Sequence, residues 1–217
     1  MFRDVFTGVD TRQKKAIPIG ELHMLLNKDP QSEKLRRTQA IANLLFQFCG
    51  MPFSDLAHLE KSNLERGLLK YNRTKTGTPM SIEVLESAQN AIGGLYNKSD
   101  ARSSGYPDYL FRILSGAYKR NEEGAYREYQ SALRRFNNEL KSLSRKLRLH
   151  SPVTSYTLRH SWATTAKYRG VPIEMISESL GHKSIKTTQI YLKGFELEER
   201  TKVNKLNYSY VCNFKML

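Results

Sequence analysis

The sequence TSYTLRHSWATTAKYRG (154–170), followed by VPIEMISESLGHKSIKTTQIYL (171–192), decides the fold predicted for this chain. It predicts three short helices in succession. Ser155 is predicted to be the N-cap of the first helix, and Gly170 supplies its C-terminal stop. The second helix is expected over 172–180. The third is expected to begin near Ser184 and to include Tyr191.

Three side chains in this stretch carry the chemistry of a phosphodiester site. The Arg159 guanidinium can fork onto two phosphate oxygens, and the His182 side chain can donate to a non-bridging oxygen. Tyr191 offers a nucleophile, although a phenol with a pKa near 10 needs cations or a base to activate it. Each also has a structural alternative: a surface ion pair for Arg159, a capping or core role for His182, and simple packing for Tyr191.

The remaining sequence predicts a mostly α fold with a small antiparallel β-sheet, in a single domain. An alternating pattern around Thr76-Gly77 predicts a hairpin with arms over 68–74 and 79–84. Helical spacing predicts helices over 18–27, 31–48, 53–60, 85–95, 109–114, 126–148 and 195–206. Residues 1–17 and 97–108 are predicted to be loop or extended, and the end of the chain (207–214) alternates like a strand.

The composition indicates a basic, intracellular protein. The 217 residues contain 35 Lys and Arg against 21 Asp and Glu, a net charge of +14. Such an excess favours a polyanionic partner, most often nucleic acid, although a generically basic protein is the alternative. Cys49 and Cys212 form neither a disulfide framework nor a metal cluster. With no signal peptide or membrane-spanning run visible, we expect a cytoplasmic protein and no membrane.

The motifs resemble the signature of the tyrosine recombinases, the phage-integrase family. That signature reads R-H-x-x-A (Arg159, His160, Ala163), then L-G-H (180–182), then a spaced Tyr, here Tyr191. The resemblance covers about residues 15–206. It implies a recombinase catalytic fold with a three-stranded sheet. It also implies a site-specific recombinase of a mobile element that cleaves and rejoins DNA through a 3′-phosphotyrosine, without metal, ATP or any other cofactor.

The resemblance also implies a role for each matched residue. Tyr191 attacks the phosphate, and Arg159 and His182 stabilise its charge. Lys75, in a K-T-G hairpin, protonates the 5′-oxygen. His160 is also part of the family motif, but it points about 100° away from Arg159 around the helix, so we expect it to be structural. The DNA-binding residues expected on this basis are Lys75, Arg73, Arg159 and Lys183.

The first departure from the family pattern is a missing arginine. The family motif G-[LM]-R-x-[ST]-[DE] corresponds to the segment 50–55, and Pro52 stands at the arginine position. Integrases of conjugative and mobilisable transposons resemble this chain here, because some also lack that arginine. Arg73 lies two residues before Lys75, and residues two apart share a face of an extended arm. We therefore expect Arg73 to be the substitute; weaker candidates are Arg36, Arg37 and Arg66.

The second departure is Tyr156, which stands where the family usually has the histidine of H-x-x-R. It lies one turn before Arg159 on the same side of the predicted helix. Its hydroxyl could still bind a phosphate oxygen, but it would be a poor base at neutral pH. Proton removal from Tyr191 would then fall to His182 or to water.

The family's organisation implies further expectations. Residues 1–15 would be a linker from a missing core-binding domain, 16–206 the catalytic domain, and 207–217 a tail that docks in trans or packs in cis. Double-stranded DNA is the expected partner, with a homotetramer on DNA, a monomer in isolation, and DNA-bending accessory proteins. A non-catalytic relative and a type IB topoisomerase are the alternatives. The apolar residues suited to docking are Phe195, Leu197, Val203, Leu206, Tyr208, Tyr210, Cys212 and Phe214.

Overall fold

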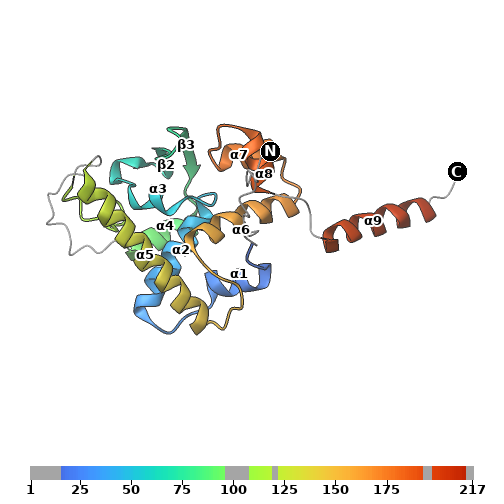
Figure 1. Ribbon diagram of the computed structural model, residues 1–217, viewed down its shortest axis with the longest axis horizontal. Coiled ribbons are helices and arrows are strands. Elements are labelled where there is room, and N and C mark those ends of the chain that lie inside the picture. The colour runs from blue at the N-terminus through green and yellow to red at the C-terminus, as the bar shows by residue number, and fades with distance from the viewer. Residues whose placement is uncertain (1–15, 96–107, 119–121, 193–196, 214–217) are drawn as a thin grey trace, which may run out of the picture.

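The computed structural model describes residues 16–95, 108–118, 122–192 and 197–213. The described part is mostly helical with one small antiparallel sheet, which confirms the predicted fold class (Figure 1). Its helices are α1 (Ile19–Asn27), α2 (Glu33–Gln47), α3 (Phe53–Ala57), α4 (Glu86–Leu95), α5 (Glu123–Lys146), α6 (Ser155–Tyr168), α7 (Ile173–Ser179), α8 (Ile185–Tyr191) and α9 (Leu197–Cys212). The predictions for residues 1–15 and for most of the 97–108 loop lie outside the described residues.

The predicted hairpin is present as two strands of a three-stranded sheet. Strands β1 (Leu64–Glu65), β2 (Leu68–Asn72) and β3 (Pro79–Glu83) pair antiparallel in the order β1-β2-β3. Leu69 pairs with Ile82, and both are buried, because residues on one face of a strand alternate with those on the other. The sheet therefore packs one face on the helices and presents its β2–β3 turn to solvent.

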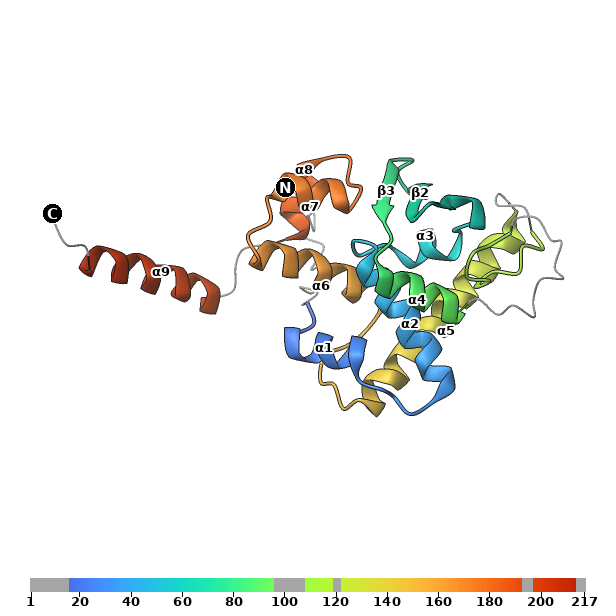
Figure 2. The same ribbon diagram turned by 180° about the vertical axis from the view of Figure 1, so that it is seen from behind.

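Helix α2 runs through the centre of the molecule. It contacts α4, α5 and α6, and its Leu44 and Leu45 side chains are fully buried among them (Figure 2). Leu158 of α6 is also fully buried in this core. A second, smaller core of Ala163, Ile176, Leu180 and Leu192 joins α6 to the α7–α8 pair. Helix α6 thus lies between the two cores, and both fix its position.

Two predicted boundaries are wrong in detail. The N-cap of α6 is Thr154 rather than Ser155, because Thr154 Oγ1 accepts the Thr157 N–H at 3.1 Å. Residues 109–114 do not form a helix. Tyr109 instead makes a β-bridge with Glu60, and Arg112 has a positive φ of 45°, which a helix cannot contain. The apolar side chains of this segment are buried by an irregular backbone.

The strand predicted at the end of the chain is also wrong. Residues 207–212 continue α9, which projects away from the helical body (Figures 1 and 2). A lone strand leaves its backbone groups unpaired, whereas a helix satisfies them within one segment. Val203, Leu206 and Tyr208 are 57–73% exposed, so these side chains do not pack on their own chain. Phe195 and Phe214, and the side chains of Leu197 and Tyr210, lie outside the described residues.

No helix in the described ranges is both long enough and apolar enough to cross a bilayer.

Candidate active site

Arg159 is buried at the centre of the candidate site, with 6% of its surface exposed. Its Nη1 donates to the Gly50 carbonyl at 2.9 Å, and its Nη2 donates to the Leu180 carbonyl at 2.7 Å. Gly50 has a φ of +64°, and a Cβ at this position would lie 3.2 Å from Arg159 Cα. A glycine is therefore needed for the chain to approach α6 this closely. The guanidinium is held from two sides before any ligand binds.

His182 follows α7 and lies against Arg159. Its Nε2 is 3.3 Å from Arg159 Nη2, and its Nδ1 is 2.8 Å from Oγ1 of the fully buried Thr188 in α8. A guanidinium can only donate, so Nε2 must accept. The imidazole proton is therefore on Nδ1 and is donated to Thr188. His182 presents a lone pair, rather than an N–H, to the cluster.

Arg73 brings a second guanidinium to the same place. It directly follows β2, has 7% of its surface exposed, and donates through Nη1 to the Leu180 carbonyl that also accepts from Arg159. Its Nε lies 2.8 Å from Oδ2 of Asp55, whose side chain is 1% exposed. The Nε–H is not directed at that oxygen, so the contact is an ion pair rather than a hydrogen bond.

Gly181 makes the approach of the β2–β3 hairpin possible. It has a φ of +64°, and a Cβ here would lie 2.8 Å from Met80 Sδ and 3.0 Å from Arg73 Cγ. Any side chain at 181 would therefore push Arg73 away from Leu180. The L-G-H motif thus serves the site through its backbone as well as through its histidine.

The cluster carries an excess of positive charge. Two guanidinium groups face one carboxylate, and the histidine is neutral. Burial, together with the positive charges of Arg159 and Arg73, lowers the pKa of His182 from 6.5 to about 4. Burial also raises the pKa of the Tyr71 phenol, which lies near Asp55, so Tyr71 stays protonated. This partly buried excess of positive charge suits an anion such as a phosphodiester.

The other predicted residues are more exposed. Lys75 lies exposed in the β2–β3 turn, and Lys183 is exposed after α7. Tyr156, in the first turn of α6, is 43% exposed, whereas Arg159 is buried. Tyr191 is the last residue of α8, and its side chain lies outside the described part of the chain.

Arg73 lies in the site, but not through the shared strand face that alternation predicts. Arg73 and Lys75 do not share a strand face, because β2 ends at Asn72 and a turn follows. Arg73 is buried beside Arg159, while Lys75 is exposed. The weaker candidates are engaged elsewhere: Arg36 pairs with Asp29 and Glu33 on the surface, Arg37 donates to the Phe111 carbonyl, and Arg66 is exposed in the β1–β2 turn.

Two residues of the cluster were not predicted as site residues. The motif over 50–55 places Asp55 at its acidic position but assigns it no role in the site, and no motif includes Thr188. A pairing of Asp55 with a residue 18 positions later depends on tertiary packing, which no local pattern shows. The signal for Thr188 was its place in α8, one turn before Tyr191 on the same face.

The lowered pKa of His182 predicts a pH dependence of stability. Between pH 6.5 and about 4, the unfolded chain binds a proton at His182 that the folded chain does not. The free energy of unfolding should therefore fall as the pH is lowered through this window. Urea unfolding of the parent and of His182→Asn at both ends of the window measures the difference. The variant should lose less stability than the parent, and equal losses would contradict the assignment.

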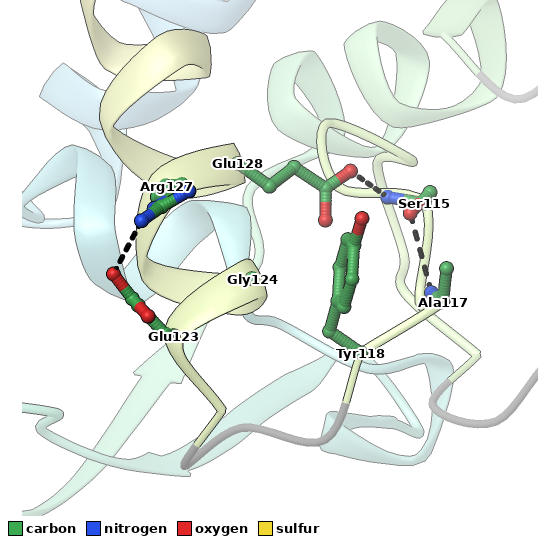
Figure 3. A pocket seen from close by; sticks show the side chains of 7 residues that line it. All are labelled: Ser115, Ala117, Tyr118, Glu123, Gly124, Arg127 and Glu128. Carbon is green, nitrogen blue, oxygen red and sulfur yellow. Dashed lines mark hydrogen bonds and ion pairs between the residues drawn. The ribbon is translucent and has the colours of Figure 1, made fainter.

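A separate cavity of about 550 Å³ lies where the 115–118 segment meets the start of α5 (Figure 3). Tyr118, Arg127 and Glu128 line it, and Glu128 Oε1 accepts the Ser115 N–H at 2.7 Å. The cavity is lined by none of the residues of the cluster at the candidate site, which are Asp55, Arg73, Arg159, His182 and Thr188. It is therefore distinct from the candidate site.

Comparison with known proteins places this geometry in a family. The phage integrase family matches residues 19–197. A probable integrase/recombinase protein of Methanocaldococcus jannaschii is 28% identical over 91% of this chain and 58% of its own length. The tyrosine recombinase XerD of Halalkalibacterium halodurans is 30% identical over 83% of this chain and 57% of its own length. The chain thus spans less than three-fifths of the length of these relatives.

Solved structures show the same fold. A crystal structure of XerA recombinase has a TM-score of 0.62 at 21% identity, covering 97% of this chain and 68% of that one. The Tn1549 transposon integrase in complex with a circular intermediate DNA has a TM-score of 0.59 at 15% identity, covering 90% and 67%. The family match over most of the sequence, with the tyrosine-recombinase fold, shows that this chain belongs to the phage integrase family.

Proposed function

We propose that this chain is the catalytic part of a site-specific DNA recombinase of a mobile element. The observation that carries the proposal is the pair of buried guanidiniums, Arg73 and Arg159, which meet at the Leu180 carbonyl next to the neutral His182. Tyr191 ends the short helix that contains Thr188, the hydrogen-bond partner of His182. A nucleophile on that helix would be close to the cations that stabilise a transferring phosphoryl group.

The reaction would proceed by transesterification. The Tyr191 Oη attacks the scissile phosphorus while the bond to the 5′-oxygen breaks, which leaves a 3′-phosphotyrosine and a free 5′-hydroxyl. A water takes the phenol proton, or Nε2 of His182 takes it after giving up the hydrogen bond from Arg159, and Lys75 gives a proton to the departing oxygen. The 5′-hydroxyl of a partner strand then loses its proton and attacks the phosphorus, the bond to Tyr191 Oη breaks, and the released phenolate takes up a proton. The phosphodiester energy is kept in the covalent bond, so the steps need no external energy source.

DNA is the proposed partner. The net charge of +14 and the exposed Lys75 and Lys183 support it, and the Tn1549 integrase of similar fold is itself bound to DNA. A tetramer on DNA, a monomer in isolation, DNA-bending accessory proteins and association with the nucleoid remain parts of the proposal. The exposed apolar side chains of α9 support docking of the segment after Tyr191 on a neighbouring protomer. The proposed boundary between the catalytic domain (16–206) and the tail (207–217) falls within this helix.

A trapping experiment tests this function. The chain is mixed with duplexes of randomised sequence that carry a bridging sulfur in place of one 5′-oxygen. A thiolate leaves without a general acid and returns poorly, so a covalent adduct should accumulate and survive denaturation. Sequencing of the trapped DNA should show a recurrent site around the sulfur.

The same experiment separates the alternatives. A type IB topoisomerase-like enzyme would give adducts without a sequence preference. A non-catalytic DNA-binding relative would bind the duplexes and give no adduct. Either result would contradict the proposed recombinase.

A further inference from the structure

Asp55, which lies in α3, contacts the two consecutive residues that directly follow β2. Its Oδ2 lies 2.8 Å from Arg73 Nε, and its Oδ1 accepts the backbone N–H of Thr74 at 3.1 Å. Its side chain is 1% exposed. A carboxylate is costly to bury unless it is paired, so these two contacts fix both the backbone and the guanidinium at this point.

The ion pair also determines which edge of Arg73 remains available. Asp55 lies at Nε, and Nη1 donates to the Leu180 carbonyl. The contacts found among the described residues therefore leave Nη2 as the amine that can turn to an anion. The Arg159 guanidinium donates to the same Leu180 carbonyl, so the two guanidiniums meet at one point of the site.

Charge balance explains why a carboxylate is required here. Two guanidiniums that share a single buried carbonyl repel each other strongly, because the water that would screen their charges is excluded. Asp55 provides the nearby negative charge that offsets one of them. Without it, Arg73 would gain by moving out to water, away from Arg159.

The location of Asp55 connects it to the missing arginine. Pro52 is the N-cap residue of α3, and Asp55 lies three residues later on the same helix. The segment that lacks the arginine thus contributes a carboxylate, and this carboxylate holds an arginine from the hairpin.

We propose that Asp55 is a positioning residue that places Arg73 beside Arg159, so that Arg73 serves in place of the arginine absent at Pro52. The inference rests on the proposed function, because it assigns Arg73 to the same phosphoryl group. Asp55 itself does not touch the substrate. Its effect on cleavage passes entirely through Arg73.

The test compares adduct formation on two substrates with the sequence found by trapping. One carries an ordinary scissile phosphate, and the other carries a methylphosphonate, which lacks one negative oxygen. An arginine that neutralises this oxygen matters less for the neutral analogue. Arg73→Ala should therefore lower the single-turnover rate on phosphate by about 10²-fold while changing the methylphosphonate rate little.

Asp55→Asn should shift the phosphate-to-methylphosphonate rate ratio in the same direction, because Asn keeps an acceptor for the Thr74 N–H but loses the charge. The double variant should be no slower on phosphate than Arg73→Ala alone, as expected for two residues that act through one contact. Asp55→Glu retains a carboxylate, and its ratio should stay closer to that of the parent than the ratio of Asp55→Asn. Asp29→Asn, which removes a surface carboxylate paired with Arg36, is the matched control and should leave the ratio unchanged.

Three results would overturn the inference. The ratio could remain at the parent value in Asp55→Asn, as expected if both substrates slow alike through a general loss of stability. The losses of rate on phosphate caused by the two single substitutions could add in the double variant. If Asp55→Asn does not fold, an Asp55→Glu chain that is slower on both substrates alike and keeps the parent ratio would also exclude the positioning role, because its effect would not pass through Arg73. A parent chain that forms no adduct on either substrate refutes the proposed function instead, so the two failures are distinguishable.

Discussion

Replacing Tyr191 with Phe should abolish the covalent adduct on the bridging-sulfur duplex, which the parent chain is expected to form. The substitution removes one oxygen and keeps the ring, so the fold and the DNA affinity should be retained. No other group can then form the 3′-phosphotyrosine bond, and the expected loss is complete rather than partial. Denaturing gels measure the adduct, and a gel shift on the same duplex measures binding.

The matched control is Tyr126→Phe, because Tyr126 is 64% exposed on α5 and has no proposed role. This variant should form the adduct at the parent rate. A Tyr191→Phe protein that still yields adduct would show that another residue is the nucleophile.

Replacing Arg159 with Ala should lower the rate of adduct formation by about 10³-fold. The guanidinium sits between the Gly50 and Leu180 carbonyls and lies 3.3 Å from His182, so its removal takes away charge and the hydrogen bond to His182 together. DNA binding should fall much less, because many other cations contact the phosphate backbone. Single-turnover kinetics at saturating protein separate the two effects.

Arg159→Lys tests which property of the arginine matters. Lysine keeps a positive charge but cannot form two parallel hydrogen bonds to a phosphate, so its rate should fall between those of the parent and Arg159→Ala. Circular dichroism confirms that both variants fold. A rate within tenfold of the parent for Arg159→Ala would exclude a direct role in charge stabilisation.

The parts of this fold that local sequence determines were predicted well. The helices of the 154–192 segment followed from glycine stops and apolar spacing, and their bounds are shifted by only a residue or two. The hairpin followed from alternation around Gly77. The resemblance to the phage-integrase family rested on motifs in that same segment, and the family match confirms it.

The wrong predictions share a physical cause, because each depended on what the segment packs against. Residues 207–212 alternate in a way that suits a strand, but no neighbouring strand pairs with them, and they form helix. Residues 109–114 have enough apolar side chains for a helix. Their backbone is nevertheless irregular, with a β-bridge between Tyr109 and Glu60, and this backbone places the apolar side chains in the core.

The candidate site shows the same limit. Arg73 donates to a carbonyl 107 residues away, and Arg159 donates to one 109 residues away, so only the folded chain brings these groups together. Strand alternation predicted that Arg73 shares a strand face with Lys75, but β2 ends at Asn72 and both residues lie in the turn that follows. The ion pair with Asp55, which alternation cannot reveal, accounts for where the guanidinium lies.

The proposed mechanism is tested most directly by identifying the side chain that is covalently bonded to DNA. The trapped adduct is digested with trypsin and nuclease, and the modified peptide is sequenced by mass spectrometry. We predict that the 3′-end nucleotide is bonded through its phosphate to Tyr191, within the α8 peptide Thr187–Lys193. A nucleotide on a different side chain, or a bond to the 5′-end of the broken strand, would contradict the account.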